Sequence, residues 1–117
     1  MRRFFEAAAA LLVETDYSFG CPVAPVILDA PDALPELQQI CRQAFEEWIG
    51  LFRDSFAAAG IASHRAESLA LLVEATMEGM LVMARAWRDI AALHSVAAEL
   101  VALVAAAVPA AVEHRVG

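Results

Sequence analysis

The sequence has no lysine, and its eight arginines face fifteen acidic residues, which gives a formal net charge of −7. Apart from Arg2 and Arg3, the basic residues form no cluster. Binding to nucleic acid depends on basic side chains that neutralise phosphates. The composition therefore predicts that this chain makes no nucleic-acid contact of its own.

Long hydrophobic runs are also missing, although 61% of the residues are hydrophobic. The longest stretch without a charge or a histidine is 100–112, which is 13 residues and contains Pro109. A membrane-spanning helix needs about 20 consecutive apolar residues. The start, "MRRFFEAAAALLVE", is interrupted by Glu6 and has no small-residue cleavage site, so it is not typical of a signal peptide. We expect a cytoplasmic chain without membrane contact, whose apolar excess is buried by a second copy.

Residues with metal or redox chemistry are few. Cys21 and Cys41 lack the CxxC spacing of a redox pair, and we expect both to act as small apolar side chains. His64, His94 and His114 lie in three separate places without a metal-ligand pattern. The sequence thus predicts no metal, no cofactor and no catalytic residue.

What the sequence does have is helical periodicity. No alternating strand pattern occurs, and three- and four-residue steps predict helices near 3–15, 33–59, 64–88 and 91–107, with a short helix within 23–30. The chain is therefore predicted to be one all-α domain over 1–117, an antiparallel bundle of about five helices. The expected boundary residues are Gly20 as a helix exit, Pro22 as an entry, Asp32 as a cap, Gly60 as an exit and Ser63 as a cap.

The predicted helix at 64–88 is apolar on two faces, which indicates packing from two sides. The last helix is apolar almost all round, and Gly79 suits the close approach of another backbone. Two such helices from each of two chains would form an intermolecular four-helix bundle. The predicted dimer interface consists of Leu71, Ala75, Gly79, Val82, Ala86, Val96, Leu100, Leu103 and Val104.

Glu74 and Glu78 share one helix face between these apolar faces, in a stripe with Glu67 and Arg85. Two carboxylates at this spacing can act as a general acid and base, which keeps a small helical enzyme among the alternatives. We interpret the stripe as solvated instead.

Aromatic and methionine side chains would face one another if the third and fourth helices pack side by side. They are Phe45, Trp48, Phe52, Met77, Met80 and Met83, with the hydroxyl of Thr76 among them. Such a set forms either a solid core or an adaptable apolar pocket. The residues alone leave both readings open.

In order and spacing, "GCPVAPVILDAPD", a long helix ending "FAAAGI", and "ALLVEATMEGMLVMARAWRD" resemble the C-terminal regulatory domain of TetR-family transcriptional repressors. The similarity is greatest to the LmrA/YxaF-like branch, with Glu78-Gly79 and Ala84-Arg85-Ala86 as shared features. It covers roughly 4–104. The family's N-terminal helix-turn-helix has no counterpart in this sequence.

The resemblance implies a domain that dimerises through its last two helices and encloses a pocket for a small hydrophobic effector. Effector binding would release the DNA-binding domains from operator DNA. By this resemblance, the pocket residues are Phe5, Leu12, Phe45, Trp48, Phe52, Thr76, Met77, Met80 and Met83. The alternative is a purely structural dimerisation module in which these side chains pack without a cavity.

Overall fold

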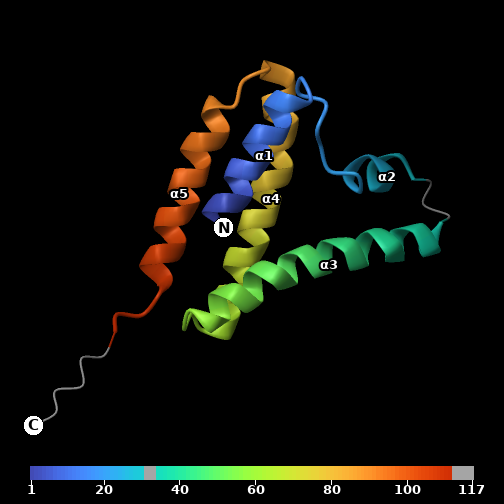
Figure 1. Ribbon diagram of the computed structural model, residues 1–117. Coiled ribbons are helices and arrows are strands. Elements are labelled where there is room, and N and C mark those ends of the chain that lie inside the picture. The colour runs from blue at the N-terminus through green and yellow to red at the C-terminus, as the bar shows by residue number, and fades with distance from the viewer. Residues whose placement is uncertain (31–33, 112–117) are drawn as a thin grey trace, which may run out of the picture.

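A computed structural model describes residues 1–30 and 34–111, and these form five helices joined by turns, without a strand. This confirms the prediction of an all-helical chain with about five helices, and the last helix has the predicted bounds. The helices are α1 (Arg2–Glu14), α2 (Ala24–Asp29), α3 (Pro35–Ala58), α4 (Ser63–Trp87) and α5 (Ala91–Ala107) (Figure 1).

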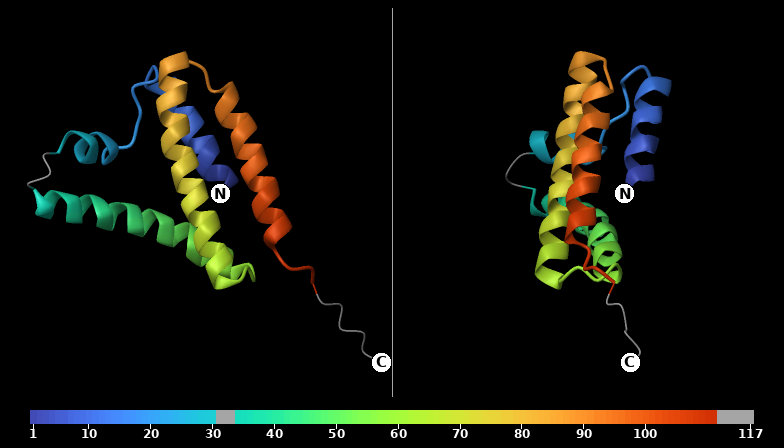
Figure 2. Two further views of the ribbon diagram at one scale, coloured as in Figure 1. Left: turned by 180° about the vertical axis from the view of Figure 1, so that it is seen from behind. Right: turned by 90° about the vertical axis from the view of Figure 1, so that its left-hand side faces the viewer.

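Helices α1, α4 and α5 lie together, with α4 and α5 antiparallel, whereas α3 meets one end of α4 and then diverges from it (Figures 1 and 2). The short helix α2 lies beside the far part of α3. Along its shortest axis the Cα trace measures only 16 Å. Since a helix with its side chains is about 10–12 Å across, the molecule is barely two helices thick.

The core lies where α1, α4 and α5 meet. Leu12, Val73 and Leu93 are each 0% exposed and come from these three helices in turn. Burying one such side chain stabilises the fold by about 1.5–3 kcal/mol. No residue of α2 is buried, so the stable part of the fold is the three-helix group together with the end of α3 that carries Phe56.

The turn after α1 differs from the prediction. Gly20 was expected to supply the left-handed residue, but Asp16 and Tyr17 have φ values of 51° and 62°. The helix ends earlier, at Glu14, and the chain reverses at once. Pro22 was expected to open the next helix, but α2 begins at Ala24, and the proline in its first turn is Pro25.

The beginnings of α3 and α4 also differ. Asp32, the expected cap of α3, lies outside the described residues, as does His114. Leu34 occupies the cap position of α3. Ser63 is the first residue of α4 and not its cap, since the preceding Ala62 has the non-helical cap conformation. Gly60 does follow α3 in the left-handed region, at φ 93°, as predicted.

Within the described ranges, no helix has the length and apolarity needed to cross a bilayer.

Candidate functional site: an acidic apolar cleft

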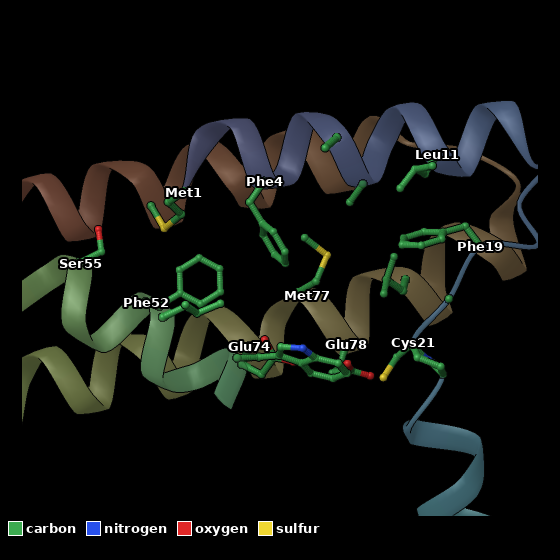
Figure 3. A pocket seen from close by; sticks show the side chains of 17 residues that line it. Met1, Phe4, Leu11, Phe19, Cys21, Phe52, Ser55, Glu74, Met77 and Glu78 are labelled. Atoms are coloured by element: carbon green, nitrogen blue, oxygen red, sulfur yellow. The ribbon is translucent and has the colours of Figure 1, made fainter. Parts of the chain in front are cut away.

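A cleft of about 580 Å³ lies between α1, α3, α4 and the segment that joins α1 to α2 (Figure 3). Its walls are mostly apolar. The lining residues are Met1, Phe4, Ala7, Ala8, Leu11, Phe19, Gly20, Cys21, Pro22, Trp48, Leu51, Phe52, Ser55, Glu74, Met77, Glu78 and Leu81.

The cleft exists because α3 diverges from α4. Side chains fill the space where the two helices meet, at Phe56 and Ile61, but farther along α3 the helices separate. Helix α1 closes one side, and its Phe4 ring packs edge-on against Phe52 of α3 with centroids 5.1 Å apart. Aromatic contacts of this kind hold α1 and α3 together across the cleft.

Two carboxylates on α4 lie at the inner wall of this cleft. Glu74 is 6% exposed, and Glu78 is half-buried one turn later. Burial, the charge of Glu78 and hydrogen bonding to Glu78 raise the pKa of Glu74 to about 7. The interpretation of both residues as a solvated stripe was therefore wrong for Glu74. It overlooked α3 and α1, which cover that side of α4.

Cys21 lies beside Glu78 (Figure 3), and its Sγ accepts hydrogen bonds from the backbone N–H groups of Val23 at 3.3 Å and Ala24 at 3.4 Å. Burial and hydrogen bonding to Glu78 raise the pKa of the thiol. A thiol with a raised pKa is a weak nucleophile at neutral pH, in line with a packing role.

A second, smaller cavity of about 320 Å³ shares Cys21 and Glu78 with the cleft and continues toward α2. Its wall also includes Arg85 and Asp29. The cleft and the smaller cavity thus lie side by side, with Phe19, Gly20 and Leu81 also common to both linings.

The segment that carries Phe19 and Cys21 is held at its start by α4. Arg88, the left-handed residue that ends α4, forms an ion pair with Asp16 and lies over the ring of Tyr17 at 5.3 Å. In addition, the backbone N–H of Phe19 donates to the hydroxyl of Thr15 at 2.9 Å. These contacts position the segment at the mouth of the cleft.

Three of the nine predicted pocket residues, Trp48, Phe52 and Met77, line the cleft. The core contains Phe5, Leu12 and Met80. The other three, Phe45, Thr76 and Met83, are not among the lining residues; Met83 is 45% exposed.

The differences have a geometric cause. On α1 the residues next in sequence to Phe5 and Leu12, namely Phe4 and Leu11, face the cleft. One residue along a helix is a rotation of 100°, which turns the side chain from the cleft to the core. The stripe of Phe4, Ala7, Ala8 and Leu11 has the i, i+3, i+4, i+7 spacing of a helix face, and this signal could have identified the wall.

The predicted dimer surface is largely open in the single chain. Leu71, Val82 and Leu103 are 48%, 68% and 38% exposed, and Ala75 and Ala86 are also exposed. Gly79, Val96 and Val104 are partly buried. Leu100 is only 5% exposed and belongs to the core of its own chain. A side chain added at Gly79 would meet nothing within 4 Å, so nothing in the single chain itself requires a glycine there.

In the described ranges, no three or more His, Cys, Asp or Glu side chains are grouped so that they could hold a metal ion. The chemistry of the cleft is therefore that of an apolar, aromatic wall with two carboxylates and a thiol.

Comparisons with known proteins identify the family. The model for the C-terminal domain of LmrA/YxaF-like transcriptional regulators matches residues 1–99. Two relatives from Mycobacterium tuberculosis, the uncharacterized HTH-type transcriptional regulators MT0206 (strain CDC 1551 / Oshkosh) and Rv0196 (strain ATCC 25618 / H37Rv), are each 37% identical over 103 residues. The match covers 84% of this chain and 53% of each relative, so the chain spans about half the length of these relatives. No solved structure matches it significantly. The chain therefore belongs to the LmrA/YxaF-like branch of the TetR-type transcriptional regulators and corresponds to their C-terminal domain.

Proposed function

We propose that this chain is the effector-binding and homodimerisation domain of a transcriptional repressor, and that the cleft between α1, α3 and α4 is the effector site. The observation that supports this most is the cleft itself. Its volume of about 580 Å³ lies within the range of about 300–1,000 Å³ that is typical of small-molecule sites, and its lining is mostly apolar. A purely structural dimerisation module has no use for such a space.

The position of the cleft suits a signalling role. In this family α1 corresponds to the helix that descends from the DNA-binding domain, and α1 forms one wall of the cleft through Phe4 and Leu11. A ligand seated between α1 and α4 changes the contacts of α1 with the rest of the domain. An effector that favours one position of α1 thereby shifts the spacing of two DNA-binding domains and lowers their affinity for operator DNA.

Dimerisation is proposed through the outward face of α4 and through α5. Exposed apolar side chains on α4, among them Leu71 and Val82, are costly in water and are covered in an antiparallel arrangement with a second copy. We do not adopt the alternative of an enzyme that uses Glu74 or Glu78, because the family consists of transcriptional regulators.

Filling the cleft tests the effector site. N-phenyl-1-naphthylamine is a neutral probe whose fluorescence rises in apolar surroundings, and we expect one molecule to bind per chain. Ala7→Trp places an indole in the cleft and should weaken binding by at least about tenfold, since the probe and the side chain occupy one space.

The matched control is Ala10→Trp, which adds the same side chain to an exposed position of α1 outside the cleft lining. It should leave probe affinity unchanged. If both variants bind the probe like the unmodified chain, the cleft is not the binding site and the structural-module alternative is favoured.

A further inference from the structure

Resting on the proposal that the cleft is the effector site, we propose that its effector is an organic cation. Such a ligand has an aromatic or aliphatic body and one positively charged amine or ammonium group. The body occupies the apolar part of the cleft, and the carboxylates of Glu74 and Glu78 receive the charge.

The first step of the argument is that Glu74 has no cationic partner. The ion pairs of the described residues are Arg42–Glu46, Arg53–Asp54, Arg53–Glu67 and Arg88–Asp16, and none includes Glu74 or Glu78. The charged group that acts on Glu74 is Glu78, a second carboxylate. Two carboxyl groups without a neighbouring cation are unusual on a buried helix face, because an unpaired buried charge is strongly destabilising.

The second step is that these carboxylates face the cleft and not the core. Glu74 is more than nine-tenths buried yet lines the cleft, next to Glu78. Because Glu74 is part of the cleft wall, a ligand seated in the cleft lies against it.

The other groups around the pair supply no compensating charge. The α3 lining, with Trp48 and Phe52, has no titratable side chain, and the segment before α2 contributes the Cys21 thiol, whose pKa is raised. Met1 lines the cleft at the start of α1, but no ion pair joins its amino group to either carboxylate. Arg85 and Asp29 line the smaller cavity beyond Glu78.

The third step concerns the kind of cation. A divalent metal ion requires several hard ligands, and the described residues hold no cluster of three. The cleft walls are instead aromatic and thioether groups, and Phe4, Phe19, Phe52 and Met77 line the same space as the two carboxylates (Figure 3). Aromatic faces attract organic ammonium groups, and the effect is largest where water is excluded. A hydrophobic ammonium compound can pair its charge with the carboxylates and also lie against the aromatic rings.

The binding of two probes of one shape tests this proposal. One is trimethyl(2-naphthylmethyl)ammonium, and the other is 2-neopentylnaphthalene, in which carbon replaces the nitrogen. Equilibrium dialysis against the unmodified chain at pH 8 measures both affinities. We expect the ammonium compound to bind at least about tenfold more tightly, because the two probes differ in charge alone.

Changing pH sharpens the test, since the quaternary ammonium carries no titratable proton. With the pKa of Glu74 at about 7, its ionised fraction rises about tenfold between pH 6 and pH 8. Affinity for the ammonium probe should rise by about the same factor over this range. Affinity for the neutral probe should stay constant.

Substitutions at the two carboxylates test whether they cause the preference for the charged probe. Glu74→Gln should remove both the preference for the charged probe and its pH dependence while the neutral probe still binds, and Glu78→Gln should reduce the preference. Glu47→Gln, at an exposed position of α3, is the matched control and should change nothing.

The outcomes separate the two proposals. Equal binding of both probes overturns the cation inference and leaves the hydrophobic effector site intact. A charge preference that persists in Glu74→Gln and Glu78→Gln also overturns the inference. If neither probe binds and N-phenyl-1-naphthylamine does not bind, the proposed function is overturned as well.

Discussion

Helix α4 buries a charged side chain on one side and exposes apolar side chains on another, which is the reverse of the usual arrangement in a monomeric protein. On the side toward α1 and α3, a carboxylate, Glu74, is 6% exposed. On the adjacent side, about 60–80° farther round the helix axis, Val82 is 68% and Leu71 48% exposed. Water would favour the opposite distribution, because charged groups lose hydration on burial and apolar groups gain from it.

This distribution is what the proposed dimer and the proposed cationic effector would explain. The outward apolar side calls for another protein surface, and the inward acidic side calls for a ligand of opposite charge. Helix α4 then connects the two, because one rigid helix forms part of both surfaces. Under the two proposals, a shift of α4 on effector binding changes the dimer contact directly.

The largest expected effect follows from placing a charge on the outward side. Val82→Glu should weaken dimerisation by at least about a thousandfold, because a two-fold interface contains the substitution twice and buries two unpaired carboxylates. Sedimentation equilibrium over a range of concentrations measures the dissociation constant.

Ile40→Glu is the control for this prediction. Ile40 is 63% exposed on α3, comparable with Val82, but lies away from the outward side of α4. Its substitution should leave the dimer intact. If the unmodified chain is monomeric, or if both variants dimerise alike, the outward side of α4 is not the interface.

An intermediate effect is expected from the inward side. Since the pKa of Glu74 is raised from 4.5 to about 7 in the folded chain, the folded state retains a proton that the unfolded chain releases. The free energy of unfolding therefore falls as pH rises from about 4.5 to 7 and is constant above, with a total loss of up to roughly 3 kcal/mol from this group.

Glu74→Gln should abolish that part of the decline and make the chain more stable than the unmodified protein at pH 8. Urea unfolding at pH 5 and pH 8, at one protein concentration, gives the difference. Glu47→Gln should keep the full decline. A Glu74→Gln chain whose stability declines as steeply as that of the unmodified protein would refute the assignment.

The smallest effect concerns the thiol at the edge of the inward side. In a Cys41→Ala background, alkylation of Cys21 by iodoacetamide should titrate with a midpoint above that of cysteine in a short solvated peptide, because burial and Glu78 raise the pKa of the thiol. Glu78→Gln should lower the midpoint and speed alkylation a few-fold at pH 8. A midpoint at or below that of the peptide in the parent chain would contradict this.

Much of the fold could be read from periodicity. The five helices and the end of α3 before Gly60 follow from residue spacing and from glycine's tolerance of positive φ. The turn after α1 could not be foreseen in the same way. There Asp16 and Tyr17 adopt positive φ, a conformation supported by contacts with Arg88 72 residues away from Asp16 in the chain.

The cleft was foreseen only in part. Trp48, Phe52 and Met77 were predicted because an aromatic and methionine stripe is visible in sequence. Phe4 and Leu11 were missed because the rotation of α1 about its axis depends on how it packs against α4 and α5. Glu74 was misread for a related reason: a carboxylate on a helix is solvated unless another element covers it.

The sequence by itself determined the class of fold, the helix lengths and the presence of an apolar excess beyond what one chain buries, since these depend on local spacing and composition. Only the tertiary structure decided which face of α1 lines a space and which enters the core. It also decided that α3 diverges from α4 to leave a cleft, and that Glu74 lies inside it. These properties depend on the angles between helices, and such angles are set by the packing of side chains that are distant in sequence.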